Sequence, residues 1–363
     1  MFPYWVLFSY FAAGALLVSE RPSPDHPQKR IYLLIGALVT AIMIGTRFKV
    51  GGDWRSYQFM FAFVEHVSLD RALEIGDPGY QFLNWSVQQL NGEIWWVNLV
   101  CAAIFIWGLT RLCLIQPKPL LAVLVAVPYM IIVVAMGYTR QSVALGILMA
   151  GLAALGRGGS VIRFAIYVAA AALFHKTAVL VLPLVIFAGK RNRILNVIAG
   201  VALFILFFDL FLSDSTDQFV KAYVEARYSS QGAWIRVILV VVPALLLLTT
   251  RGRFGLTEQE EKVWRYVALA ACTLPIILIT TPSSTAVDRM ALYLMPLQIV
   301  VLSRAYLLFR NPKFGVVAVI AYALAVQFTW LTFAQHSKFW VPYRSNLLED
   351  TSARRNYDSN DRR

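Results

Sequence analysis

Charged residues are scarce in this sequence. Asp, Glu, Lys and Arg make up 15% of its 363 residues, 59% are hydrophobic, and the mean hydropathy is +0.63. Soluble domains hold about 25% charged residues, so this composition excludes an ordinary soluble globular protein. Apolar runs at 31–46, 94–110 and 314–334 are each long enough to cross all or most of a hydrocarbon layer roughly 30 Å thick. The sequence therefore predicts a protein embedded in a membrane.

Cysteine and histidine are rare as well. The three cysteines, Cys101, Cys113 and Cys272, lie in or beside apolar segments without C-x-x-C spacing, and the four histidines are far apart. These spacings exclude a disulfide framework and show no pattern of metal ligands. We therefore expect no metal and no cofactor.

The formal net charge of +13 has a topological explanation. Basic residues form short clusters between apolar runs instead of following one face, so we expect no nucleic-acid partner. Segment 4–19 lacks a basic leader and a cleavage site, so we expect a retained helix. Basic loops stay in the cytoplasm, which places both termini outside. The clusters predicted to be cytoplasmic are Arg21/Lys29/Arg30, Arg111/Lys118, Arg157/Arg163, Lys190/Arg191/Arg193, Arg251/Arg253/Lys262/Arg265 and Arg304/Arg310/Lys313.

The predicted fold class is all-α, a polytopic membrane protein with about twelve transmembrane segments. We expect a single transmembrane domain over 1–335 and a polar C-terminal tail over 336–363. Two long connections, 47–93 and 213–232, should form extracytoplasmic lid loops, and 54–67 should form an interfacial helix. The expected segments are near 4–19, 31–46, 94–113, 119–136, 138–156, 161–174, 176–189, 194–212, 233–250, 264–281, 290–307 and 314–334.

The pair of segments within 161–189 is expected to be short. One straight helix would place the basic cluster after position 189 outside, against the rule that basic loops stay in the cytoplasm. Two short segments keep that cluster on the cytoplasmic side. We predict a short or re-entrant pair. His175, at its middle, should then lie below the outer surface in a cavity lined by protein, where irregular backbone is tolerated.

Four polar groups share the outer side in this topology. Ionisable groups at membrane depth are costly and usually face an internal cavity, where they bind or transfer something. The groups are Arg47 with Gly51-Gly52-Asp53-Trp54-x-x-Tyr57, Tyr138-Thr139-Arg140-Gln141, Phe174-His175-Lys176-Thr177, and Asp288-Arg289-x-x-x-Tyr293.

Arg140, Lys176 and Arg289 each stand at the start of a segment that runs inward. Each combines a cation with the positive end of a helix, an arrangement that binds anions. The guanidinium groups of Arg140 and Arg289 also offer paired N–H donors, a geometry suited to phosphate oxygens. The alternative is that each arginine snorkels to the outer headgroups. We expect a phosphate or pyrophosphate ligand.

His175 and Asp53 are the candidate bases. His175 could accept a proton, or it could be a hydrogen-bonded structural histidine. Asp53 precedes Tyr57 by one helical turn, so both could face the same cavity. Alternatively, Asp53 caps the interfacial helix or pairs with Arg47. The stretch Gly76–Tyr80 is interpreted first as a turn.

At these residues the sequence resembles the EpsG family, a branch of the Wzy-type polysaccharide polymerases found in bacterial exopolysaccharide and capsule loci. The resemblance covers nearly the whole chain, with Trp54 where a tyrosine and Asp77 where a glutamate would be expected. It rests on R-x-x-x-G-G-D-W-x-x-Y (Arg47 to Tyr57), D-P-G-Y-Q-F-L (Asp77 to Leu83), T-R-Q-S-V-A (Thr139 to Ala144), F-H-K-T-A (Phe174 to Ala178), D-R-M-A-L-Y (Asp288 to Tyr293) and W-V-P-Y (Trp340 to Tyr343).

The resemblance implies a GT-C-like membrane glycosyltransferase that joins undecaprenyl-pyrophosphate-linked oligosaccharides on the periplasmic face of the bacterial inner membrane, without a metal. Arg140 and Arg289, with Lys176, would then neutralise the leaving pyrophosphate, and His175 or Asp53 would take the acceptor proton with inversion at the anomeric carbon. The other residues expected to bind substrate are Arg47, Tyr57, Gln141 and Tyr293.

Partners expected from this function are membrane lipid, the lipid-linked glycan, a flippase and a polysaccharide co-polymerase. Two alternatives remain open. A transporter or flippase of lipid-linked glycans also needs cations that face a cavity, although we see no internal repeat. An O-antigen-type ligase would use the same donor with a different acceptor. A membrane acyltransferase is disfavoured because we find no nucleophile or paired catalytic groups.

Overall fold

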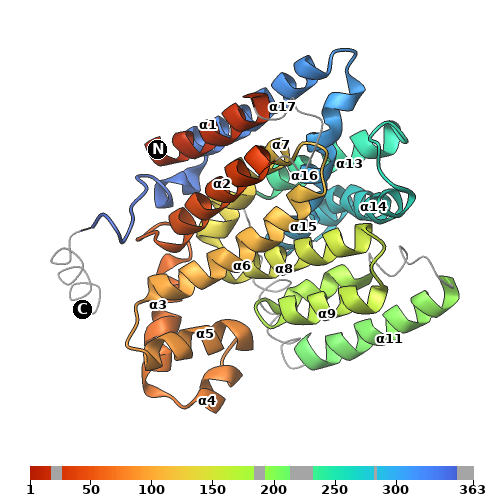
Figure 1. Cartoon of the computed structure of the whole chain (residues 1–363). Helices are drawn as coiled ribbons and strands as arrows, with labels where there is room; N and C mark the ends of the chain where they lie inside the picture. The colour runs from red at the N-terminus through yellow and green to blue at the C-terminus, as the bar shows by residue number, and fades with distance from the viewer. Residues whose placement is uncertain (18–26, 184–192, 213–231, 282–283, 350–363) are drawn as a thin grey trace.

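A computed structural model describes residues 1–17, 27–183, 193–212, 232–281 and 284–349. These residues form helices and connecting loops, and the one isolated β-bridge among them joins Arg47 and Ser345 (Figure 1). The predicted all-α class is confirmed. The predicted lid loop 213–232 lies outside the described residues, except for its last residue.

The first half of the chain holds the helices from α1 to η3. They are α1 (Phe2–Leu17), α2 (Pro27–Gly45), α3 (Trp54–Phe63), the 3-10 helix η1 (Val64–His66), α4 (Leu69–Glu74), α5 (Pro78–Gln89), α6 (Ile94–Leu114), α7 (Pro119–Ala126), the π-helix η2 (Val127–Ala135), α8 (Thr139–Gly156), α9 (Val161–Ala172) and the 3-10 helix η3 (Lys176–Val181).

The second half completes the bundle. Its helices are α11 (Arg193–Leu212), α13 (Ala233–Thr249), α14 (Glu258–Thr280), α15 (Ser284–Leu294), α16 (Pro296–Arg304), the 3-10 helix η6 (Ala305–Leu308), α17 (Pro312–Phe333) and the 3-10 helix η7 (Gln335–Phe339).

The protein is a membrane protein by the length and composition of its helices. Among the described residues, α6, α8, α14 and α17 are long and apolar enough to cross a bilayer, and α15 with α16 makes a fifth candidate span if the bent pair counts as one. Further apolar helices, including α1, α9 and α13, are shorter than this criterion requires.

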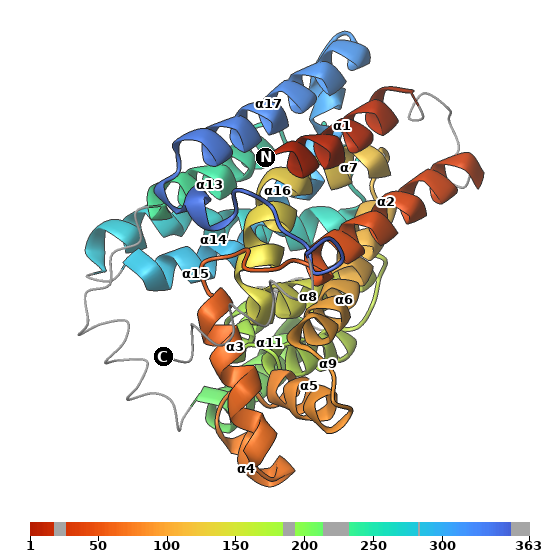
Figure 2. The ribbon, with the colours of Figure 1, turned by 90° about the vertical axis from the view of Figure 1, so that its left-hand side faces the viewer.

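Helix α8 is the central helix of the bundle. Its span is 89% buried, and it packs closely along α6 (Figure 2). Gly108 of α6 and Gly146 of α8 face each other so closely that a Cβ on Gly108 would lie 1.7 Å from the carbonyl oxygen of Gly146. This close approach requires glycine, and it fixes α6 against α8.

The chain has two polar ends separated by the length of α6. At one end, Arg47 contacts Asn98 near the start of α6 and Thr139 at the start of α8. At the other end, Arg304 contacts Gln116, just after α6. We call these the Arg140 end and the Arg304 end. Because α6 has 21 residues and rises 1.5 Å per residue, about 30 Å separates them.

Helices α3, α4 and α5 lie at the Arg140 end, outside the bundle (Figures 1 and 2). The helix predicted over 54–67 is present as α3 followed by η1. The predicted break at His175 is present too, because α9 ends at Ala172 and η3 begins at Lys176.

One helical segment differs in shape from the sequence-based prediction. The helix expected to begin near 290 begins at Ser284 and bends by 47° at Met295 and Pro296, so it is not one straight segment. Proline at the start of α16 allows this bend, because it fixes φ and has no amide hydrogen.

The start of the expected C-terminal tail packs against the Arg140 end. The indole of Trp340 donates a hydrogen bond to the carbonyl of Ile132 (2.8 Å), and Ser345 pairs with Arg47 in the β-bridge. Trp340 is 2% exposed, although tryptophans near the interface usually form an aromatic belt. This segment therefore belongs to the folded bundle as far as residue 349.

Candidate active site

Arg140 is held by a carboxylate from another element. Its Nη1 donates to Oδ2 of Asp77 at 2.7 Å, and the Arg140 side chain is 29% exposed while that of Asp77 is 8% exposed. The backbone amide of Arg140 also donates to the hydroxyl of Tyr57 at 3.4 Å. A half-buried ion pair thus ties the start of α8 to the loop before α5, and Tyr57 of α3 joins them.

Asp77 uses its other oxygen to hold the break at His175. Oδ1 accepts a hydrogen bond from the amide of Lys176 at 3.2 Å, and two residues on, the amide of Gly79 donates to the carbonyl of Leu173 at 2.7 Å. A Cβ on Gly79 would lie 3.0 Å from that carbonyl oxygen, so the contact favours glycine. The sequence predicted only a turn here. The carboxylate directly before Pro and Gly was the signal that could have indicated more.

Arg289 contrasts with Arg140. Its guanidinium lies over the ring of Tyr138, 5.2 Å from the centroid, and among the described residues it has no carboxylate partner. The backbone carbonyl of Arg289 accepts a hydrogen bond from Nε2 of Gln141 at 2.9 Å, which fixes α15 beside α8. Arg289 is half-buried and forms no ion pair with a carboxylate among the described residues, although its charge reaches Asp53.

His175 lies outside the helices, in a cluster with two hydroxyl groups. Its Nδ1 is 2.7 Å from Oγ1 of Thr177 and 3.2 Å from the hydroxyl of Tyr293, and the two hydroxyl oxygens are 3.0 Å apart. If Nδ1 carries the proton and donates it to a hydroxyl, Nε2 is the nitrogen with a free lone pair.

The charges around His175 favour its neutral form. Burial, followed by the nearby guanidiniums of Arg289 and Arg140, holds the pKa of His175 well below its usual range. A neutral imidazole is the form that can accept a proton. The same two arginines lower the pKa of Asp53, but burial has the larger effect and raises it overall. Both candidate bases therefore lie within the electrostatic reach of both arginines.

Asp53 does not take the structural roles considered for it. It stands at the N-terminal boundary of α3, yet its side chain makes no capping hydrogen bond there. The guanidinium of Arg47 bonds elsewhere. Tyr57, one turn later, is buried and packs edge-on against Tyr80, with ring centroids 5.5 Å apart.

The comparison with protein families decides the membership of the chain. The sequence model described as the EpsG family matches residues 30–345. The chain belongs to the EpsG family. No curated protein and no solved structure matches the chain. EpsG proteins are Wzy-type polysaccharide polymerases, so membership indicates a polysaccharide polymerase-type membrane protein, and the residues described above all lie within the match.

Of the residues predicted for the site of this EpsG-family chain, the structure brings most together. Contacts link Arg140 with Tyr57, Gln141 with Arg289, and His175 with Tyr293. The Lys176 amide reaches Asp77, and its side chain is half-buried. Asp53 is linked to the cluster through the charges of Arg140 and Arg289.

Arg47 borders this cluster and is bonded to the helix ends around it. It is 1% exposed, and its guanidinium donates to the carbonyl of Ile44 (2.7 Å), to Asn98 (3.1 Å) and to Thr139 (2.6 Å). These bonds connect the end of α2 with the starts of α6 and α8. In the structure Arg47 therefore supports the residue directly before Arg140. Its predicted contact with substrate stays a prediction.

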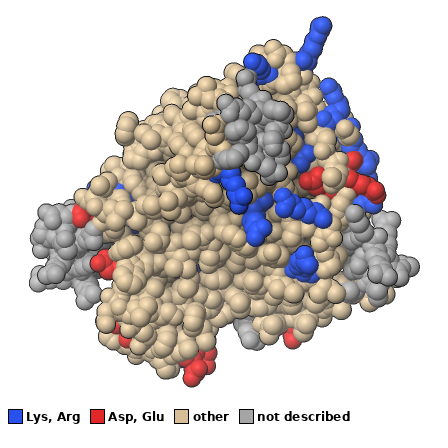
Figure 3. Space-filling view, in the orientation of Figure 1, with Lys and Arg blue, Asp and Glu red and all other residues tan. Residues whose placement is uncertain are grey.

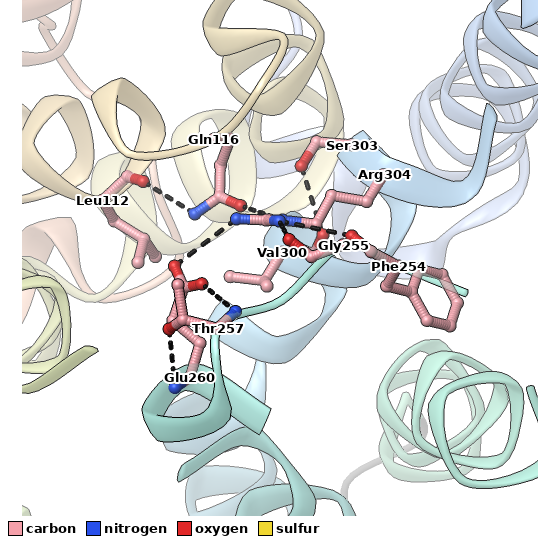
Figure 4. A network of polar contacts seen from close by, with 9 residues as sticks. All are labelled: Leu112, Gln116, Phe254, Gly255, Thr257, Glu260, Val300, Ser303 and Arg304. Atoms are coloured by element: carbon pink, nitrogen blue, oxygen red, sulfur yellow. Dashed lines mark hydrogen bonds and ion pairs between the residues drawn. The ribbon is translucent and has the colours of Figure 1, made fainter. Parts of the chain in front are cut away.

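The Arg304 end is organised differently (Figure 4). Arg304 is 3% exposed, and it donates to Gln116 (2.9 Å), to the carbonyl of Gly255 (2.9 Å) and to Glu260 (3.4 Å). Glu260 also completes a capping box with Thr257 at the start of α14. Here a buried arginine has its charge paired and its guanidinium bonded, and it joins α6, α14 and α16.

Proposed function

We propose that this EpsG-family chain is an inverting, metal-independent glycosyltransferase that joins undecaprenyl-pyrophosphate-linked oligosaccharide repeat units into a polysaccharide. The observation that carries this proposal is the arrangement at the Arg140 end. There two arginines, one of them without an acidic partner among the described residues, lie within electrostatic reach of a histidine whose neutral form is favoured.

The proposed reaction is a single displacement. The oxygen of an acceptor hydroxyl attacks the anomeric carbon of the donor sugar and forms the new glycosidic bond, while the bond from that carbon to the pyrophosphate oxygen breaks. The electron pair leaves with undecaprenyl pyrophosphate. The acceptor proton passes to Nε2 of His175, or in the alternative assignment to Asp53.

The arginines would stabilise the charge that grows on the leaving group. Arg289 and Arg140, with Lys176, would contact the pyrophosphate, an electrostatic role strengthened away from bulk water. We assign the larger share to Arg289, because Asp77 already neutralises part of the charge of Arg140. Tyr57, Gln141 and Tyr293 would position these groups or contact the glycan.

The proposal places the site on the periplasmic face of the bacterial inner membrane. On the face of the molecule in Figure 3, lysines and arginines gather toward the side where α13, α14 and the start of α17 lie, which is the Arg304 end. Basic residues favour the cytoplasmic side, so the Arg140 end would face the periplasm. A GT-C-like arrangement of about twelve membrane segments remains part of the proposal, supported by the short helices that accompany the full-length spans.

The test is reconstitution. Purified protein in liposomes receives a synthetic undecaprenyl-pyrophosphate repeat unit, and the products are separated on a gel. We expect a ladder of repeats with the natural chain and a strongly reduced one with Arg140→Ala, although that variant still reaches the membrane. Full-length polymer from Arg140→Ala would overturn its assignment.

The transporter alternative predicts a different outcome. A flippase would move the lipid-linked unit across the liposome membrane without forming a ladder. In cells, deletion of a polymerase leads to single-repeat glycan, whereas deletion of a flippase prevents the unit from reaching the outer side. Movement without a ladder across suitable repeat units would contradict the polymerase proposal.

A further inference from the structure

Arg236 and Asp288 form a buried ion pair beside Arg289 at the Arg140 end, and neither residue contacts the His175 cluster in the bonds described above. Arg236 of α13 is 8% exposed and Asp288 of α15 is 5% exposed. The guanidinium of Arg236 also lies over the ring of Tyr129, 5.9 Å from its centroid, in the π-helix η2. Charged groups are costly to bury in a membrane protein, so a pair that is kept there calls for a physical reason.

The pair lies next in sequence to the candidate site. Arg289 and Tyr293 are four residues apart on α15, so they share one face of that helix. That face meets α8 through Gln141 and reaches His175. Asp288 precedes Arg289 by one residue, about 100° around the helix, and meets α13 instead.

Helix α15 needs such a contact, because the span to which it belongs is not continuous. It has 11 residues and is bent by 47° relative to α16 at Met295 and Pro296. Because Pro296 has no amide hydrogen to donate across the bend, α16 holds the rotation of α15 less strictly than one continuous helix would. The Arg236–Asp288 pair on one side and the bond from Gln141 on the other can set it.

We propose that Arg236 and Asp288 are positioning residues whose ion pair sets the rotation of α15 and so directs Arg289 and Tyr293 toward His175. This inference deepens the proposed function and rests on it for its catalytic consequence. A buried pair used only for stability could be replaced by apolar residues of similar size without loss. A positioning pair could not, because an apolar replacement fills the space but does not fix the rotation.

The decisive variant replaces both charges at once, Arg236→Met with Asp288→Leu, so that no unpaired charge stays buried. We expect normal protein in the membrane, with the reconstituted ladder reduced by about a hundredfold, because small displacements of a catalytic group have effects of that size. The matched control is Lys262→Met with Glu258→Leu at the Arg304 end. It removes an exposed pair and should leave the ladder unchanged.

A second readout does not depend on polymerisation. Arg289→Cys is introduced into a chain with Cys101→Ala, Cys113→Ala and Cys272→Ser, and its rate of reaction with a water-soluble thiol reagent is measured. We expect the Arg236→Met/Asp288→Leu change to alter this rate by about threefold or more, because thiol reactivity depends on exposure and nearby charge. The control pair should leave it unchanged.

The outcomes separate the two proposals. A changed labelling rate supports the positioning role even if the natural chain forms no ladder, in which case only the polymerase proposal fails. A normal ladder and an unchanged labelling rate in Arg236→Met/Asp288→Leu would overturn the positioning role. If that variant does not accumulate, Arg236→Lys takes its place. This variant keeps the positive charge but lacks the planar guanidinium group. A normal ladder with an unchanged labelling rate would again overturn the positioning role, and a change in the labelling rate would support it.

Discussion

The two polar ends of this chain use arginine in opposite ways. At the Arg304 end, the guanidinium is bonded to a carboxylate, an amide and backbone carbonyls, and it is almost fully buried. At the Arg140 end, Arg289 lies over an aromatic ring and forms no ion pair with a carboxylate among the described residues, and Arg140 is only partly covered. The difference teaches that a fully bonded arginine holds helices together, whereas an arginine with unused charge is ready to bind an anion.

The largest expected effect comes from removing that unused charge. Arg289→Ala should lower polymer formation by about a hundredfold to a thousandfold, the usual loss when one electrostatic contact to a developing charge is removed. Its free energy of unfolding should change by less than about 1 kcal/mol, because no described carboxylate is left unpaired. Reconstituted ladders and membrane protein levels measure the two effects.

Arg304→Met is the matched variant at the other end. It leaves Glu260 buried without its partner and should cost about 3–5 kcal/mol of stability, so that little protein reaches the membrane. The comparison between the two ends fails if Arg304→Met accumulates normally and loses only activity, or if Arg289→Ala is lost by degradation.

Asp77→Asn sharpens the comparison within the Arg140 end. The carbonyl oxygen of the new amide can still accept from Lys176, but the charge-assisted bond that holds the Arg140 guanidinium in place is lost, and such bonds contribute about 1.5–3 kcal/mol. We expect about a tenfold to hundredfold loss of polymer. Adding Arg140→Gln should restore any lost protein level without restoring polymer. Recovery of polymer in the double variant would show that Asp77 only balances charge.

The acid limb of the pH profile tests the charges around His175. Arg289 lowers the pKa of His175, so Arg289→Gln should raise that pKa. The imidazole then becomes protonated at a higher pH, and the residual rate should fall off at a higher pH than in the natural chain, whose limb should lie below the ordinary histidine value of about 6.5.

The same measurement separates the two candidate bases. Arg289 also lowers the pKa of Asp53, so a shift alone does not name the base. His175→Gln should remove the acid limb if His175 is the base. A limb that persists in His175→Gln and disappears in Asp53→Asn would assign the proton to Asp53.

Tyr293→Phe is expected to have the smallest effect. It deletes one hydroxyl from the cluster with His175 and Thr177, and the remaining Thr177 bond at 2.7 Å still orients the ring. One neutral hydrogen bond contributes about 0.5–1.5 kcal/mol, so polymer formation should fall roughly twofold to tenfold. Thr177→Ala should cost more than Tyr293→Phe, and the reverse order would contradict this account of the cluster.

The sequence could predict what depends on polarity and charge. The membrane class, the all-α fold, the break at His175 and the grouping of Arg140, Arg289 and Tyr293 all follow from polar residues interrupting apolar runs. The bend at Pro296 was missed, because hydropathy does not distinguish a straight span from two packed pieces.

The partners of buried polar groups could not be predicted, because they come from distant parts of the chain. Asp77 is 63 residues from Arg140, and the local Gly and Pro signals indicated only a turn. Arg304 looked like one basic residue of a cytoplasmic loop, although Glu260 and Gln116 bury it. Trp340 begins the W-V-P-Y motif near the end of the chain, and nothing local to that motif indicates that its indole bonds to Ile132 inside the bundle.

The most direct test asks which side of the membrane each end faces. In a chain without its natural cysteines, Gly52→Cys reports the exposed position beside Asp53, and Lys262→Cys reports the exposed start of α14. We predict that a membrane-impermeant thiol reagent added to spheroplasts labels position 52 at once and position 262 only after permeabilisation. Labelling of position 262 in intact spheroplasts, with position 52 protected, would contradict a periplasmic site for the two arginines and the imidazole.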